Sequence, residues 1–116
     1  MTRNHNVDSG IHQDAVVGKA IRAIVPLCDP DAIIVFGSRA RGEETPASDL
    51  DLLVICSQIT SRRETRIAIR IALSNLGVPK DVLVASSEDV RTHGQVPGTV
   101  LKTALEEGIV VYERAP

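Results

Sequence analysis

Two apolar runs, joined by a short polar stretch, constrain this chain more than any other part of its sequence. The first run, Ala32–Phe36, predicts a buried strand, and Gly37 follows it with the residue that best tolerates a tight turn. The second run begins at Asp49-Leu50-Asp51 and continues with apolar residues to Ile55. Because side chains two residues apart share one face of a strand, Asp49 and Asp51 are expected side by side.

The paired carboxylates and the glycine turn suggest a shared task. Two carboxylates on one face repel each other unless a cation neutralises them, and the hard cation that suits their oxygens best is Mg²⁺. Gly37 and Ser38 offer a tight turn and a hydroxyl that can approach phosphate groups. Each feature alone has a simpler explanation, a strand-ending turn or a solvated strand end. Ten residues separate Ser38 from Asp49, and the combination predicts a site that moves a nucleotide.

Two arginines lie in the loop that follows the Gly-Ser turn. Arg39 and Arg41 either bind the β- or γ-phosphate of a nucleotide or only keep the loop soluble, and both alternatives remain open. We include both in the predicted nucleotide-binding set.

A third carboxylate is expected where the next strand begins. Nucleotidyl transfer with two metal ions needs a further ligand for the ion that activates the attacking hydroxyl. Asp81 opens that strand, and its side chain meets Asp51 if the two strands are neighbours. Alternatively, Asp81 only ends the turn after Pro79. Glu88 and Asp89 are weaker candidates, since a helix cap explains them.

The predicted elements alternate between helices and strands. Their order predicts a single α/β domain, α+β in the wider sense, in which helices flank a small mixed sheet. Residues 1–12 lack any periodicity and are expected to form a flexible tail, which leaves 13–116 as the domain. The first predicted helix covers residues 14–27 and is capped by Asp14, the second covers residues 61–76, and the last begins at Pro97 or Thr99 and ends at Glu107. The predicted strands cover residues 32–36, 49–55, 81–86 and 109–112.

The second helix has a clear start and an ambiguous surface. Ser61 and Glu64 form a capping box, the apolar pattern predicts Ile67 and Ile71 in the core, and Gly77 is expected to end the helix. Four arginines recur at helical spacing on another face. They form either a solvated cationic face or a docking surface for an acidic partner or for nucleotide phosphates. These are Arg62, Arg63, Arg66 and Arg70.

Composition excludes several classes of function. With one Phe, one Tyr, no Trp and a net charge of -2, the chain has neither stacking platforms nor a basic footprint, so no direct nucleic-acid binding is expected. No apolar stretch has the length of a membrane span, so we expect no membrane association and a cytoplasmic location. Cys28 and Cys56 lack the spacing of metal ligands and are expected to be reduced and partly buried.

The stretches Gly37-Ser38-Arg39-Ala40-Arg41-Gly42 and Ser48-Asp49-Leu50-Asp51-Leu52-Leu53-Val54 resemble the signature of minimal nucleotidyltransferases, small members of the polymerase-β-like nucleotidyltransferase superfamily. The resemblance runs from the first helix to the last strand and implies a nucleotidyltransferase-like fold. It further implies that the three aspartates bind two Mg²⁺ ions and that the Gly-Ser turn holds the triphosphate of ATP. Lys80 departs from the pattern, which has an apolar residue before the third aspartate. The predicted site comprises Gly37, Ser38, Arg39, Arg41, Asp49, Asp51 and Asp81.

Many such proteins resemble antitoxins that pair with a HEPN-domain ribonuclease toxin. The resemblance implies that the antitoxin transfers AMP from ATP to a tyrosine of this toxin partner, with which it would form an oligomer. The residues themselves lead only to Mg²⁺-dependent nucleotidyl transfer, and they favour a macromolecular acceptor because so short a chain has no second domain to enclose a small one. Two alternatives stay open: a stoichiometric antitoxin that covers the toxin without transfer, and nucleotidylation of a small molecule.

Overall fold

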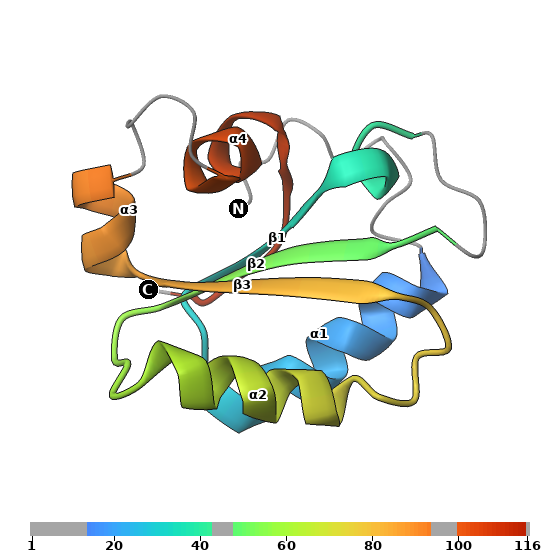
Figure 1. Cartoon of the computed structure of the whole chain (residues 1–116), viewed down its shortest axis with the longest axis horizontal. Helices are drawn as coiled ribbons and strands as arrows, with labels where there is room; N and C mark the ends of the chain where they lie inside the picture. Colours follow the sequence, from blue (N-terminus) through green and yellow to red (C-terminus); the bar gives the residue numbers. More distant parts are fainter. Residues whose placement is uncertain (1–13, 43–47, 94–99, 116) are drawn as a thin grey trace.

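A computed structural model describes residues 14–42, 48–93 and 100–115, which form a four-stranded sheet with helices against both faces (Figure 1). This arrangement confirms the predicted fold class, a small α+β domain with a mixed sheet. The strands are β1 (Ala32–Phe36), β2 (Leu50–Cys56), β3 (Lys80–Ser86) and β4 (Ile109–Glu113). The helices are α1 (Ala15–Cys28), the short 3₁₀ turn η3 (Gly37–Arg39), α2 (Arg62–Ala72), α3 (Ser87–His93) and α4 (Val100–Glu107).

The strand order β3-β2-β1-β4 brings the predicted site to one end of the sheet. Strand β1 runs antiparallel to β2 and β4, whereas β2 and β3 are parallel because α2 provides the crossover between them. Asp51 of β2 therefore lies beside Asp81 of β3 on one side and Phe36 of β1 on the other. The end of β1 and the beginnings of β2 and β3 thus meet at the same edge.

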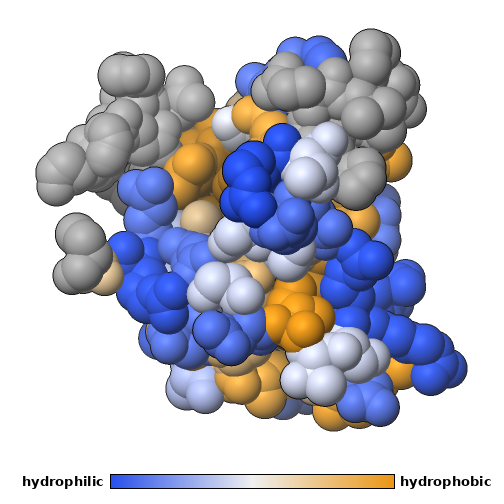
Figure 2. Space-filling model, turned by 90° about the vertical axis from the view of Figure 1, so that its left-hand side faces the viewer, coloured by the Kyte–Doolittle hydropathy of each residue, from blue (hydrophilic) through white to orange (hydrophobic). Residues whose placement is uncertain are grey.

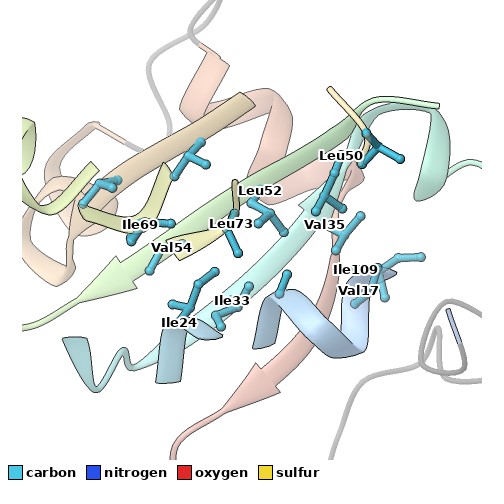
Figure 3. Close-up of a cluster of buried hydrophobic side chains, with 14 of the residues drawn as sticks. Val17, Ile24, Ile33, Val35, Leu50, Leu52, Val54, Ile69, Leu73 and Ile109 are labelled. Atoms are coloured by element: carbon cyan, nitrogen blue, oxygen red, sulfur yellow. The ribbon is translucent and has the colours of Figure 1, made fainter. Parts of the chain in front are cut away.

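The main core lies between the sheet and helices α1 and α2, and Figure 3 shows its side chains. Every second residue of β2 contributes to it, as Leu50, Leu52 and Val54 do, all of them 0% exposed. Burying an aliphatic side chain of this size contributes about 1.5–3 kcal/mol, so this layer fixes the position of β2 firmly. A smaller cluster under α4 includes Leu53 and Ala104 and covers the opposite face.

The predicted helix starts are confirmed at both long helices. The carboxylate of Asp14 accepts hydrogen bonds from the backbone N–H groups of Val16 and Val17, at 2.8 and 3.3 Å, and so caps α1. The hydroxyl of Ser61 accepts one from the N–H of Glu64 at 3.1 Å and caps α2. These caps satisfy donors that the first turn of a helix leaves unpaired.

Helix α2 departs from its prediction in length and in orientation. It ends at Ala72, and Gly77 lies in the following turn with φ +78. Ile69 is 0% exposed, whereas Ile67 and Ile71 are 43% and 67% exposed, so the prediction that these two isoleucines are buried was wrong. Leu73, which was also expected to face the core, is 1% exposed. The reason for the difference is that α2 packs on both β3 and α1, and this pair of neighbours selects the stripe that contains Ile69.

Other boundaries shift by about one residue. Strand β2 begins at Leu50 and β3 at Lys80, each one residue from the predicted start. The predicted tail at residues 1–12 and the predicted start of the last helix at residue 97 lie outside the described residues. In the part of the chain that the structure describes, no helix has both the length and the apolar character needed to span a membrane.

Candidate functional site

Three aspartates lie at the edge where β1 ends and where β2 and β3 begin. Asp49 directly precedes β2, Asp51 is its second residue, and Asp81 lies beside Asp51 in the parallel register. Because Leu50 and Leu52 face α1 and α2, strand alternation directs Asp51 to the face covered by α4. The same alternation directs Asp81 there, together with Leu83. The predicted meeting of Asp51 and Asp81 is therefore confirmed.

The carboxylates are close enough to influence one another. Asp51 is half-buried, and its pKa is raised, first by burial and then by the negative charges of Asp81 and Asp49. The positive charge of Arg41 acts in the opposite direction and lowers the pKa of Asp51. The site thus concentrates negative charge that a bound cation would stabilise.

The aspartates do not form a closed metal cage. Within the ranges 14–42, 48–93 and 100–115, no group of three or more His, Cys, Asp or Glu side chains is arranged to hold a metal ion. The donors that are present suit Mg²⁺, which keeps several waters and binds through one or two carboxylates together with substrate phosphates. Asp49, Asp51 and Asp81 are thus oxygen donors of the kind that Mg²⁺ binds, although they are not arranged as a metal site by themselves.

The glycine turn is built around the carboxylate of Asp51. Gly37 has φ +76, a conformation that other residues adopt with difficulty. A Cβ atom added at Gly37 would lie 3.1 Å from Cγ of Asp51 and would overlap one of its carboxylate oxygens. Ser38 follows in η3, where the N–H of Ala40 donates to the carbonyl of Gly37 at 3.1 Å. Gly37 is thus required by both the backbone and its neighbour.

The two arginines of the loop have different environments. Arg39 is 3% exposed, and its guanidinium donates to the carboxylate of Asp14 at 2.6 Å. It also donates to the carbonyl groups of Ser48 at 2.9 Å and Asp49 at 3.3 Å. Neither sequence-based alternative, a phosphate ligand or a solvated side chain, describes this buried guanidinium. Arg41, in contrast, is exposed beside the acidic cluster.

The contacts of Arg39 identify a residue that the sequence reasoning missed. Asp14 was expected only to cap α1, yet its second carboxylate oxygen is the counter-ion of Arg39. Through that arginine, the start of α1 is tied to the backbone at Asp49. A capping aspartate followed by a distant loop arginine carries no sequence signal for this contact.

The weaker acidic candidates lie away from the cluster. The carboxylate of Asp89 accepts a hydrogen bond from the N–H of Ser86 at 3.0 Å, and the hydroxyl of Ser86 accepts one from the N–H of Asp89 at 2.9 Å. The hydrogen bond from the Ser86 backbone is the main reason why the pKa of Asp89 is lowered. Asp89 is thus a helix-capping residue, which confirms the alternative considered for it.

Comparison with known proteins connects this geometry to nucleotidyl transfer. The sequence profile of the family described as "Polymerase beta, Nucleotidyltransferase" matches residues 19–116. The chain is 36% identical over 97 residues to the bifunctional uridylyltransferase/uridylyl-removing enzyme of Bordetella pertussis. The aligned region covers 79% of this chain and 11% of that protein. It is also 34% identical over 55 residues to MJ0141 of Methanocaldococcus jannaschii, which is named as a candidate protein adenylyltransferase. That alignment covers 47% of this chain and 54% of MJ0141. The chain therefore spans only part of each relative.

Two solved structures share the fold. A candidate nucleotidyltransferase from Sulfolobus solfataricus matches with a TM-score of 0.57 and 15% identity, over 97% of this chain and 91% of that one. A structure described as a toxin–antitoxin with AMP-PNP matches with a TM-score of 0.52 and 20% identity, over 87% of this chain and 73% of that one. At these identities the similarity concerns the arrangement of helices and strands.

Proposed function

We propose that this chain, which belongs to the polymerase beta nucleotidyltransferase family, transfers AMP from ATP to a hydroxyl group of a partner protein. The observation that carries the proposal is the register between β2 and β3, in which Asp51 and Asp81 are neighbours beside the turn at Gly37. Residues 13–116 would constitute the nucleotidyltransferase domain.

Each residue of the site would have a defined role. Asp49 and Asp51 would hold two Mg²⁺ ions, and Asp81 would complete the set around the ion nearest the acceptor. Gly37 and Ser38 would hold the β- and γ-phosphates of ATP, with Arg41 as their counter-charge. Mg²⁺ bound there would neutralise the triphosphate and lower the pKa of the attacking hydroxyl.

The reaction would be an in-line substitution at the α-phosphate. The acceptor oxygen forms a bond to the α-phosphorus, and the bond from that phosphorus to the oxygen bridging to the β-phosphate breaks. Pyrophosphate leaves, and the proton of the acceptor hydroxyl passes to solvent. The contribution of the chain is to align the two reactants and to stabilise the developing charge.

The acceptor we propose is a tyrosine of a HEPN-type ribonuclease toxin, for which this chain would be the antitoxin. Three observations support a protein acceptor of this kind: the motif that resembles minimal nucleotidyltransferases, the name of the Methanocaldococcus relative, and the toxin–antitoxin neighbour with a bound ATP analogue. In this proposal the attached AMP blocks RNA cleavage by the toxin.

The test is incubation of the full chain with labelled ATP and Mg²⁺, with and without the product of the neighbouring gene. Label on a tyrosine of that product, lost with EDTA or with the double variant D49A/D51A, would support the proposal. A tight complex without label would instead favour an antitoxin that only covers its toxin. Parallel reactions with UTP, CTP and GTP test the nucleotide, because one relative is named for uridylyl transfer.

A further inference from the structure

A groove follows the outer edge of β3 and ends at Asp81. In the described part of the sheet β3 is an edge strand, and its residues Asp81 to Val84 line the groove directly. One wall comes from α2 and the other includes Val100 of α4; Figure 1 shows these two helices on opposite faces of the sheet. A strand edge of this kind can pair with an extended segment of another chain.

The arginines of α2 run alongside this edge. At one end, Arg62 contacts Asp89 at 2.5 Å, and at the other, Arg70 donates to the carbonyl of Lys80 at 3.1 Å. Helix α2 and strand β3 thus run side by side in opposite directions. Arg63 and Arg66 lie between these two anchoring contacts, so a line of positive charge follows the groove.

The two middle charges of the row, those of Arg63 and Arg66, form no ion pair in the part of the fold that the structure describes. Arg62, Arg66 and Arg70 follow one another at intervals of four, a spacing at which like charges destabilise a helix slightly. This row of arginines slightly destabilises its own helix, and it lines a groove. A negatively charged ligand in the groove therefore explains the row better than a contribution to the stability of the fold does.

The order of the strands indicates which substrate uses the groove. Strand β2, with Asp49 and Asp51, separates the Gly37 turn at the end of β1 from Asp81 on β3. A triphosphate held at the Gly37 turn lies on the β1 side, where Phe36 marks the end of the groove, and the open side at β3 is left for the acceptor. The hydrophobic residues that line the groove are Phe36, Val82, Leu83, Val84 and Val100.

The far end of the groove lies towards α3. Figure 2 views the molecule from that side and shows that hydrophilic side chains predominate there, with hydrophobic surface in smaller patches between them. A partner that extends over this end would therefore meet mainly polar side chains.

We infer that this groove binds an extended, acidic segment of the acceptor protein along β3 and brings its hydroxyl to Asp81. The inference rests on the proposed function and adds to it the substrate class: an acceptor whose modified hydroxyl lies close to several carboxylates. Backbone pairing with β3 would supply affinity, and the arginines of α2 would select for negative charge.

The test uses two fluorescent polymers as probes, a random copolymer of glutamate and tyrosine and one of lysine and tyrosine. Binding of each to the full chain is measured by fluorescence anisotropy without nucleotide, and MgATP binding is measured separately. The glutamate copolymer should bind, and the double variant R63E/R66E should weaken that binding by about tenfold or more without changing MgATP binding. The matched control K19E/R22E reverses two exposed charges on α1 and should leave both affinities unchanged.

The outcomes separate the groove from the proposed reaction. Equal losses in R63E/R66E and K19E/R22E would reflect net charge alone and would overturn the inference. Loss of MgATP binding in R63E/R66E, with copolymer binding intact, would assign the arginines to the triphosphate and would also overturn it. Copolymer binding that depends on Arg63 and Arg66 without any transfer of label would support the groove and contradict the proposed transfer. Transfer of label to the copolymer that does not depend on Arg63 and Arg66 would support the proposed transfer and would overturn the inference about the groove.

Discussion

The guanidinium of Arg39 lies 2.6 Å from the carboxylate of Asp14, although 25 positions separate the two residues in the chain. The same guanidinium donates to the carbonyl of Asp49. One buried ion pair therefore connects the first turn of α1 to the backbone that presents the first aspartate of the site. This connection makes the stability of the fold and the geometry of the site depend on a common contact.

Substitution of Asp14 should reveal that contact. Asp14→Ala removes both the helix cap and the counter-ion of a buried charge, and we expect it to lower the free energy of unfolding by at least about 3 kcal/mol. Asp14→Asn keeps an oxygen that can cap α1 but leaves Arg39 without its counter-ion, so it should still be strongly destabilising. Urea denaturation measures both. If Asp14→Asn is as stable as the unmodified chain, the ion pair does not carry the energy assigned to it.

Gly37→Ala should inactivate the site through a direct clash. The new Cβ would overlap a carboxylate oxygen of Asp51, so this side chain must move. A displacement of the order of 1 Å lowers the rate of transfer by about 100-fold. Label transfer from ATP to the acceptor measures the effect.

Gly77→Ala is the matched control for this variant. Gly77 has φ +78, close to the +76 of Gly37, but no atom lies within 4 Å of its added Cβ. It should therefore lose only about 1 kcal/mol of stability, from backbone strain, and keep its transfer rate. Equal rates for the two alanine variants would show that the contact between Gly37 and Asp51 does not matter for transfer.

Asp51→Asn should separate stability from activity. Burial, and after it the negative charges of Asp81 and Asp49, disfavour the ionised form of Asp51, so removing its charge relieves both the cost of desolvation and the repulsion. We expect the variant to unfold at the same or a higher temperature and to lose transfer. Asp89→Asn is the contrasting control, because hydrogen bonds lower the pKa of Asp89 and its charge is stabilising. A less stable Asp51→Asn variant would assign Asp51 a structural role.

Features that depend on local sequence were predictable. The run Ala32–Phe36 became β1 with the predicted bounds, and the caps at Asp14 and Ser61 followed from side chains that bond within three residues. The neighbouring positions of Asp51 and Asp81 followed from a helical crossover between parallel strands. The partner of Arg39 was not predictable, because the loop sequence reads as polar surface and the counter-ion belongs to a distant helix.

The orientation of α2 was ambiguous for a related reason. Isoleucines at positions 67, 69 and 71 alternate with other residues, so helical stripes through 67 and 71 or through 69 and 73 fit the same sequence. Only the packing of α2 on β3 and α1 selects between them.

Alanine substitutions test that orientation. Ile69→Ala empties a fully buried position and should lower the free energy of unfolding by about 2–4 kcal/mol. Ile71→Ala, at a side chain that is 67% exposed, should change it by no more than about 0.5 kcal/mol. Both remove the same atoms from the same helix, so the difference reports burial. The reverse ranking would support the face predicted from sequence.

Two thiols lie at the end of the core opposite the aspartates, and they should make the stability of the fold depend on pH in the alkaline range. Sγ of Cys56 lies 3.8 Å from Sγ of Cys28, and both cysteines are free. Burial raises the pKa of Cys56 from 9.0 to about 12, with a smaller contribution from Cys28, and it raises the pKa of Cys28 as well. The folded state therefore disfavours the thiolate more than the unfolded state does.

The sign of the effect follows from this difference. Below about pH 9 the thiols are protonated in both states and their full contribution to stability is present, whereas above it the unfolded state loses protons first and stability falls towards pH 12. Cys56→Ala removes the larger of these contributions, so its free energy of unfolding should fall less between about pH 8 and pH 11 than that of the unmodified chain. Loss of the sulfur atom also lowers the free energy of unfolding by the same amount at every pH. Urea denaturation at several pH values separates this constant loss from the change of the free energy of unfolding with pH. Parallel curves for the two proteins would show that Cys56 titrates in the folded chain as it does in the unfolded one.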